Sequence, residues 1–183
     1  MPDERFWESL FDAGLILSAL GINSGLRDVA EFGCGYGTFT IPIARAVSGL
    51  VYTFDIDPAM ISRTEKRAIS EGLGNVVCRQ RDVMEQGFGL VRGSVDVALL
   101  FNILHCENPQ VLLGHAAEAV RTGGSVLVIH WRFDPSTPRG PSLDIRPKPQ
   151  QIVRWAEQTG QLALEGETID LPPWHYGLRL KRA

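Results

Sequence analysis

Short apolar runs alternate along the chain with longer stretches in which apolar residues recur at helical spacing. The short runs, rich in β-branched residues and bounded by glycine, predict buried strands, and the longer stretches predict amphipathic helices. The expected strands span residues 27–32, 50–54, 76–79, 95–101, 125–130, 162–171 and 174–181. The expected helices comprise one or two within residues 3–20, followed by 38–47, 58–71, 109–120 and 149–159.

The order of these elements predicts an α/β protein in which a parallel sheet is covered by helices. The almost wholly apolar run at 95–101 predicts a central strand that is buried on both faces. The last two strands meet at Pro172-Pro173, and so short a connection predicts that they are antiparallel. With 183 residues the chain fits a single domain, 1–183, which begins with a helical segment at 1–25.

Residues 131–149 differ from the rest of the chain because Pro135, Pro138, Pro141, Pro147 and Gly140 exclude a helix or strand there. A loop of this length in a compact domain is usually functional, so we expect it to border a substrate. The aromatic side chains of the N-terminal segment, Phe6, Trp7 and Phe11, would form the opposite wall. The charged residues of the loop either contact a polar acceptor or are ordinary solvated charges: Arg132, Arg139, Asp144 and Arg146.

Three glycines, Gly33, Gly35 and Gly37, lie between the first expected strand and the next helix. Glycine adopts backbone angles that other residues avoid, and it lets a ligand approach the main chain closely. The helix that follows presents free N–H groups at its start. The segment therefore predicts a nucleotide-type binding turn, although a purely structural turn would have the same pattern.

The neighbours of these glycines distinguish between two kinds of ligand. The dinucleotide fingerprint G-x-G-x-x-G would place glycine at position 38, where this chain has Thr38. Glu31, at the end of the strand, would repel a pyrophosphate but would attract a cationic amino group. S-adenosylmethionine carries an amino group and a sulfonium and has no phosphate, so Glu31 favours that cofactor.

Two more acids follow expected strands. Asp55 ends the second strand, where a carboxylate accepts both hydroxyls of a ribose, although a capping or loop role is the alternative. Asp57 is expected to cap the next helix. Asp82 follows the third strand, where it would accept a hydrogen bond from an adenine amino group with Val83 beside the ring; a solvated loop acid is the alternative.

These motifs, in this order, resemble the class I S-adenosylmethionine-dependent methyltransferases, and most closely the small-molecule branch related to ubiquinone and menaquinone biosynthesis. The resemblance covers residues 29–130. It implies a three-layer, doubly wound, seven-stranded sheet of the Rossmann-like methyltransferase kind, mostly parallel with an antiparallel C-terminal strand. The matching segments are EFGCGYG at 31–37, FDIDPAM at 54–60, RDV at 81–83 and DVALLFNILH at 96–105.

The resemblance also implies roles for individual residues. Gly33 and Gly35 would line the methionine moiety, with Glu31 beside it. Ile56 would cover the adenine face, and Asn102 would lie where the methyl group is delivered. The full set of expected cofactor-binding residues is Glu31, Gly33, Gly35, Gly37, Asp55, Ile56, Asp82, Val83 and Asn102.

Two histidines are candidates for a general base. His105 follows the fourth strand, and His130 ends the fifth, at the sheet edge where ligands bind in such folds. The unperturbed pKa of histidine is close to neutral, which suits proton transfer. Alternatively, His105 begins the following helix and merely packs or caps. His175, between Trp174 and Tyr176, is expected to be a packing residue.

The composition of the chain narrows the classes of molecule that it is expected to bind. The net charge of −3, without a basic block, disfavours nucleic acid, and no apolar run is long enough to span a membrane. The three cysteines form no C-x-x-C pair and predict reduced thiols in a cytoplasmic protein, and no clustered ligands predict a metal. We therefore expect a small-molecule acceptor and the product S-adenosylhomocysteine. The sequence leaves the oligomeric state open, a dimer included.

Two alternative functions stay open at this point. An NAD(P)-dependent oxidoreductase would share the architecture, although Glu31, Thr38 and the C-terminal hairpin count against it. A non-catalytic module would keep the S-adenosylmethionine pocket and methylate nothing, and the sequence does not exclude it.

Overall fold

The computed structural model describes residues 3–183. Positions 1 and 2 of the expected N-terminal segment lie outside the described residues. The helices are α1 (Glu4–Glu8), α2 (Ala13–Ala19), α3 (Thr40–Ala46), α4 (Pro58–Ser70), α5 (Val83–Gln86), α6 (Pro109–Ala119) and α7 (Pro149–Gln158). The strands are β1 (Val29–Phe32), β2 (Val51–Asp55), β3 (Val76–Gln80), β4 (Val95–Phe101), β5 (Val120–Trp131), β6 (Leu162–Leu164), β7 (Ile169–Leu171) and β8 (His175–Arg182).

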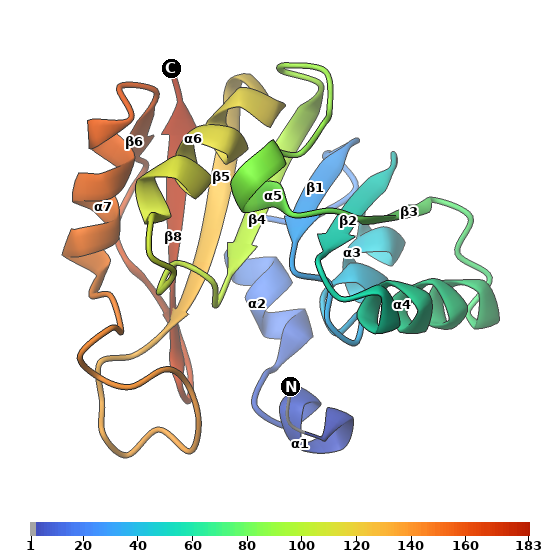
Figure 1. The fold of residues 1–183 in the computed structure, drawn as a ribbon, viewed down its shortest axis with the longest axis horizontal. Coiled ribbons are helices and arrows are strands. Elements are labelled where there is room, and N and C mark those ends of the chain that lie inside the picture. Colours follow the sequence, from blue (N-terminus) through green and yellow to red (C-terminus); the bar gives the residue numbers. More distant parts are fainter. Residues whose placement is uncertain (1–2) are drawn as a thin grey trace.

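The strands form one sheet in the order β3-β2-β1-β4-β5-β8-β6, with β7 also paired to β8 (Figure 1). The first five strands are parallel, and β8 runs antiparallel to β5, β6 and β7. The order reverses between β1 and β4. In open α/β sheets ligands bind in the crevice at the carboxyl ends of the strands at such a reversal.

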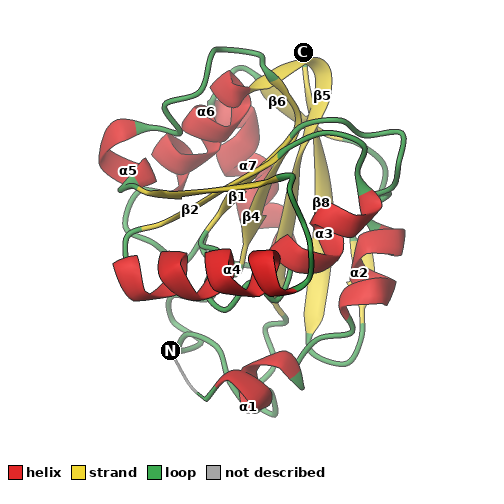
Figure 2. Ribbon diagram, turned by 90° about the vertical axis from the view of Figure 1, so that its right-hand side faces the viewer, coloured by secondary structure: helices red, strands yellow, loops and turns green. Residues whose placement is uncertain are grey.

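Helices cover both faces of the sheet, with α2, α3 and α4 on one side and α5, α6 and α7 on the other (Figure 2). Two hydrophobic clusters fill the layers between helices and sheet. The central strand β4 contributes Ala98 and Leu100 to one cluster and Val97 and Leu99 to the other. The three-layer, mostly parallel fold and the buried central strand predicted from the sequence are thus confirmed.

The C-terminal part differs from the prediction in strand number. The expected strand at 162–171 is two strands, β6 and β7, separated by a turn at Gly166 with φ +78°. Both halves pair with β8, so the sheet has eight strands where seven were expected. The residues between the two apolar runs, 165–168, are polar or glycine, and the alternation changes phase across them, which marks the break.

The loop at 131–149 lies at the carboxyl ends of β4 and β5, and α1 lies at the same end of the sheet (Figure 1). As predicted, the loop holds no helix or strand between the end of β5 and the start of α7. Arg146 organises it and is only 6% exposed. Its guanidinium donates to the carbonyl oxygens of Arg132 (2.8 Å), Asp134 (3.2 Å) and Pro141 (2.6 Å) and to Thr137 Oγ1 (2.6 Å). Arg146 is therefore neither a solvated charge nor free to contact an acceptor.

Replacement of Arg146 by methionine is expected to loosen this loop while the sheet stays folded. The substitution leaves several carbonyl groups without a donor, and each such loss costs about 1–3 kcal/mol when the group stays buried. We expect chymotrypsin to cleave the loop at exposed Phe133 about tenfold faster than in the wild type, because local opening follows local stability. Arg139→Met is the matched control, since Arg139 is exposed, and equal cleavage of the two variants would contradict the role of Arg146.

Candidate functional site

A cavity of about 240 Å³ opens at the carboxyl ends of β1, β2 and β4, where the strand order reverses. Five of the nine cofactor residues expected from the sequence line it: Gly33, Gly35, Asp55, Ile56 and Asn102. The other lining residues are Trp7, Phe32, Cys34, Thr38, Phe39, Phe101 and Ile103. Segments that lie far apart in the chain thus converge where the fold places a ligand.

The glycine turn is tied to β2, because Gly33 N and Cys34 N both donate to the carbonyl oxygen of Phe54, at 2.8 and 3.1 Å. Gly33, Gly35 and Gly37 have φ of +82°, +52° and +76°, which L side chains avoid. A Cβ on Gly33 would meet no atom within 4 Å, so this glycine exposes its backbone to open space in the cavity wall. Gly37 does not line the cavity.

Substitution of Gly33 and of Gly37 by alanine is expected to separate two effects: obstruction of the ligand and strain in the backbone. Both variants adopt a left-handed backbone angle, which costs roughly 1–2 kcal/mol of stability. A Cβ at Gly37 also meets Thr64 at 3.3 Å, so Gly37→Ala loses stability without touching the cavity. At Gly33 the methyl group projects where a bound cofactor would approach, and we expect a further loss of at least about tenfold in S-adenosylmethionine affinity. Calorimetric titration and thermal unfolding of both variants check this, and the same affinity for both would contradict it.

Glu31 is buried beneath the glycine turn and does not line the cavity. Its Oε2 accepts hydrogen bonds from the hydroxyls of Thr40, at 2.5 Å, and Thr53, at 2.7 Å. Burial raises the pKa of Glu31 from 4.5 to about 7, against the lowering effect of these hydroxyls, and the nearby charge of Asp55 raises it further. Sequence analysis did not single out Thr40 and Thr53, because only the paired strand and the following helix bring them to Glu31.

Asp55 ends β2 and faces the glycine turn. Its Oδ2 accepts from Gly35 N at 3.1 Å, and its Oδ1 accepts from Asp57 N at 3.0 Å. Asp57 caps α4 by accepting from Ala59 N at 2.8 Å, which confirms its predicted role. Ile56 is 65% exposed and lines the cavity. Asp55 and Ile56 therefore present a carboxylate and an apolar surface side by side.

Asp82 and Val83 lie at the start of α5 and do not line the cavity. Asp82 Oδ1 accepts from Met84 N and Glu85 N, at 3.0 and 3.2 Å, so this oxygen caps the helix. The side chain of Val83 is fully buried in the hydrophobic cluster beneath α6. Their contact with an adenine edge stays a prediction.

Asn102 follows β4 and has φ +55°. Among the described residues it is the only one other than glycine with a positive φ. Its backbone N–H donates to Ile129 O at 2.8 Å, which fixes the turn. Its side-chain Oδ1 and Nδ2 are buried without a hydrogen-bond partner in the described part of the chain. A strained backbone and an unsatisfied buried amide are typical of a position shaped for a ligand.

Aromatic side chains form one wall of the cavity. Phe39 and Phe101 meet edge to face with ring centroids 5.0 Å apart, and Trp7 of α1 also lines the cavity. Sequence analysis assigned Trp7 to the acceptor wall and did not single out Phe39 or Phe101, because a helical apolar pattern does not distinguish a cavity wall from a core. An aromatic wall suits a sulfonium cation, since ring faces attract positive charge.

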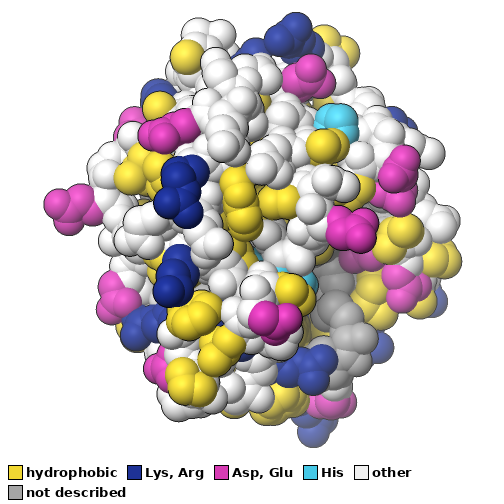
Figure 3. All heavy atoms as spheres, turned by 60° about the vertical axis from the view of Figure 1, so that its left-hand side comes forward, with side chains coloured by type: hydrophobic (Ala, Val, Ile, Leu, Met, Phe, Trp, Pro, Cys, Tyr) yellow, Lys and Arg dark blue, Asp and Glu magenta, His cyan; other side chains and the backbone are white. Residues whose placement is uncertain are grey.

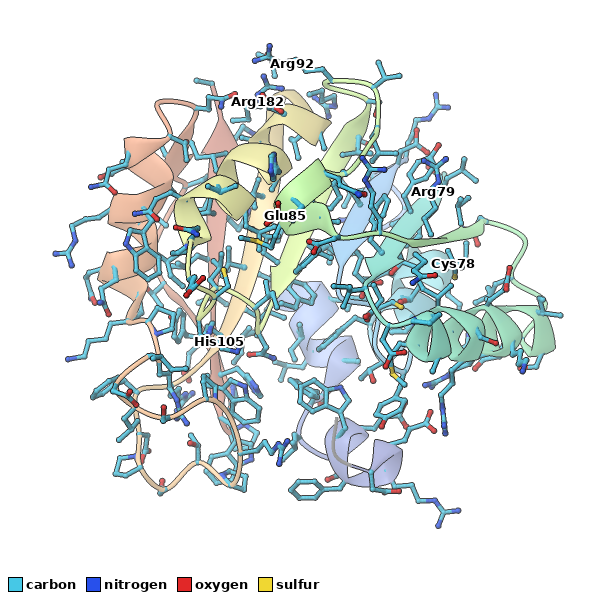
Figure 4. All side chains as sticks on the ribbon, viewed as in Figure 1. Cys78, Arg79, Glu85, Arg92, His105 and Arg182 are labelled. Atoms are coloured by element: carbon cyan, nitrogen blue, oxygen red, sulfur yellow. The ribbon has the colours of Figure 1, made fainter. Side chains whose placement is uncertain are left out.

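The two candidate histidines lie together on the side of the sheet covered by α6 and α7. Their ring centroids are 5.6 Å apart, and Figure 4 places His105 beside the 131–149 loop, at the opposite end of the sheet from Arg92 and Arg182. Burial lowers the pKa of His105, and burial together with the charge of His105 lowers the pKa of His130 to about 3. Both are therefore neutral at pH 7.

His175 packs against Phe11 and Trp131, with ring centroids 4.6 and 4.2 Å away, as its predicted packing role requires. Within residues 3–183, no three His, Cys, Asp or Glu side chains gather closely enough to hold a metal ion. Nor does any helix in this range have the length and apolar character needed to cross a bilayer.

Residues 29–124, more than half of the chain, match the family described as a methyltransferase domain. The chain belongs to this methyltransferase family. The match contains the glycine turn, Asp55, Asp82 and Asn102, and it includes every residue that lines the cavity except Trp7. The family and the cofactor predicted from the sequence, S-adenosylmethionine, are thereby supported, and the oxidoreductase alternative falls away.

Three similar proteins illustrate how far this likeness extends. The methyltransferase is 28% identical over 113 residues to the catalytic subunit of a tRNA (adenine(58)-N(1))-methyltransferase of Candida albicans; the aligned part is 61% of this chain and 33% of that protein. A SAM-dependent methyltransferase from Aquifex aeolicus superposes with a TM-score of 0.84 at 20% identity, covering 97% of this chain and 93% of that one.

The third is geranyl diphosphate C-methyltransferase from Streptomyces coelicolor, solved with Mg²⁺, geranyl diphosphate and S-adenosyl-L-homocysteine. It superposes with a TM-score of 0.77 at 14% identity and covers 93% of this chain and 77% of that one. The two structural likenesses show a shared fold. The chain spans only a third of the length of its curated relative. Two of the three names state an acceptor, and these two acceptors, tRNA and geranyl diphosphate, are chemically different.

Proposed function

We propose that this methyltransferase binds S-adenosylmethionine in the cavity at the carboxyl ends of β1, β2 and β4 and transfers its methyl group to a small-molecule acceptor. The observation that carries the proposal is the meeting, in one cavity, of a left-handed glycine with open space before it, a carboxylate and an unsatisfied buried amide. These are Gly33, Asp55 and Asn102. The cavity thus offers backbone approach, a ribose acceptor and an unused hydrogen-bonding group.

When bound, S-adenosylmethionine supplies an electrophilic methyl group on a sulfonium. Gly33 and Gly35 would lie against its methionine part, and Glu31, beneath the turn, would add negative charge near the amino group. Asp55 would accept the ribose hydroxyls, and Ile56 would cover one adenine face. Gly37 would keep the turn closed, and Asp82 and Val83 would border the adenine edge.

His105 is the better of the two candidate bases. A conjugate acid with a pKa of about 3, as His130 has, holds a proton too weakly to remove one from a hydroxyl near neutral pH. His105 is only half-buried and is therefore open to an acceptor, whereas His130 is fully buried. In this proposal His105 accepts the acceptor's proton, and His130 holds it in position by ring contact.

A small-molecule acceptor is favoured over RNA although the curated relative bears the name of a tRNA methyltransferase. The net charge is −3, whereas a nucleic-acid site needs an excess of Lys and Arg to contact phosphates. The relative is also three times longer than the part that this chain matches. The likeness alone therefore does not indicate that this chain methylates the same acceptor.

Calorimetric titration with S-adenosylmethionine, S-adenosylhomocysteine and NADH tests the cofactor. We expect the first two to bind and NADH not to bind; the opposite result would refute the proposal. Incubation with methyl-labelled cofactor and separate pools of small molecules and tRNA then tests transfer. Label in a small molecule supports the proposal, label in tRNA replaces the acceptor class, and binding without transfer to any pool indicates a non-catalytic module.

A further inference from the structure

A second and larger cavity, of about 980 Å³, lies between the 131–149 loop, the start of α7 and the segment after β4. Leu104, His105 and Cys106 line it, and the three residues before them, 101–103, line the cofactor cavity. One short stretch of chain therefore separates the two cavities. The volume lies in the range of small-molecule sites. We name this cavity the acceptor groove.

The interior of the acceptor groove is apolar. Leu104 is fully buried at its base, and Trp155 of α7 is half-buried in its wall. Leu143, Pro147 and exposed Phe133 of the loop also line it. The Arg146 contacts described above hold this loop in place, so the groove is a preformed surface.

The charges at the rim of the groove balance. Lys148 and Arg154 are exposed cations, and Glu107 and Asp144 are exposed acids. Arg146 also lines the groove, but its guanidinium is saturated by loop oxygens. Figure 3 shows this side of the molecule, where acidic and basic side chains are interspersed and do not gather by sign. Exposed and opposed charges give little net attraction for an ion.

Neutral polar atoms without partners lie at the inner end of the groove. His105 Nδ1 is buried and has no hydrogen-bond partner among residues 3–183. His130 lies against this ring, is fully buried and does not itself line the groove. The burial that lowers both pKa values keeps the rings neutral, so each ring offers one donor and one acceptor. A buried polar group without a partner is costly, and a ligand hydroxyl would satisfy it.

We infer that the acceptor groove takes an uncharged, largely apolar molecule, aromatic or alicyclic, with a hydroxyl group directed at His105. The apolar walls bind the body of such a molecule, and the neutral ring of His105 recognises its hydroxyl. Two exposed acids share the rim with the two exposed cations, so a carboxylate or phosphate gains little there and is disfavoured. The inference that the bound molecule is a methyl acceptor rests on the proposed function. The binding itself is measurable without methyl transfer.

The test compares three probes of similar shape by ligand-observed NMR and calorimetric titration, with and without S-adenosylhomocysteine. They are 2-naphthol, 6-hydroxy-2-naphthoate and naphthalene. We expect 2-naphthol to bind about tenfold more tightly than either of the others, because it alone combines an apolar body with a hydroxyl and no charge. Tighter binding of the naphthoate, or equal binding of naphthalene, would overturn the inference.

Three variants locate the binding. His105→Phe keeps the ring shape and is expected to reduce 2-naphthol affinity to that of naphthalene, whereas His105→Asn, whose amide lies near the position of Nδ1, restores much of it. Lys148→Met removes a rim cation and is expected to leave 2-naphthol affinity unchanged. Unchanged affinity in a folded His105→Phe variant, or a loss in Lys148→Met, contradicts the site. If S-adenosylhomocysteine fails to bind while 2-naphthol binds as expected, the proposed function fails and the site stands.

Discussion

Replacement of Asp55 by alanine is expected to weaken S-adenosylmethionine binding by at least about a hundredfold. A carboxylate that accepts ribose hydroxyls contributes about 1.5–3 kcal/mol per hydrogen bond, and two such bonds correspond to a factor of that size or more. The substitution also removes the acceptor of Gly35 N, which lies 3.1 Å from Asp55 Oδ2 and helps to shape the turn. Calorimetric titration of the folded variant measures the loss.

Two further variants separate these effects. Asp55→Asn keeps one oxygen for Gly35 N but loses the charge, so we expect a loss smaller than that of the alanine variant. Asp57→Ala removes the cap of α4 two residues away and is expected to cost about 1 kcal/mol of stability with little change in affinity. Unchanged affinity in Asp55→Ala, or an equal loss in Asp57→Ala, would show that Asp55 does not bind the cofactor.

Replacement of Glu31 by glutamine is expected to raise the free energy of unfolding at pH 8 by up to about 3 kcal/mol. Burial raises the pKa of Glu31 in the folded protein from 4.5 to about 7. Between these two pKa values the folded state holds a proton that the unfolded state releases. The free energy of unfolding of the protein therefore falls as pH rises through that interval. Each pKa unit corresponds to about 1.4 kcal/mol, and the amide, which stays neutral, avoids the cost.

The difference in the free energy of unfolding between the variant and the wild type isolates the contribution of Glu31. The neutral buried histidines act in the opposite direction, because burial lowers the pKa of His130 and of His175 to about 3 and protein stability falls as pH falls below about 6.5. They are the same in both proteins and cancel in the comparison. Denaturant unfolding should therefore show a difference that is large at pH 8 and vanishes near pH 4.

The same variant is expected to bind S-adenosylmethionine more weakly at pH 8, because it lacks the negative charge beneath the turn. A protein that gains stability and loses affinity would show that Glu31 is retained for binding at a cost in stability. Glu157→Gln, at an exposed position of α7, is the control and should change neither property by more than about 0.5 kcal/mol. A pH-independent difference for Glu31→Gln would contradict the assignment of its pKa.

The sequence by itself determined the features that depend on local patterns. The apolar run of β4 predicted a buried central strand, and Asp57-Pro58 predicted the start of α4. The glycine turn was predicted because Gly33 and Gly35 need backbone angles that are local properties of the chain. Class, family and cofactor follow from these short motifs because parallel strands carry their carboxyl ends to the same edge.

Only the tertiary structure decided what depends on contacts between distant segments. It placed Thr53 against Glu31, Trp7 in the cofactor cavity and His130 beneath His105, none of which has a periodic signature. It also converted Arg146 from an apparent loop charge into the group that organises the acceptor wall. Burial, hydrogen bonding and charge balance are sums over neighbours in space, and these neighbours are distant along the chain.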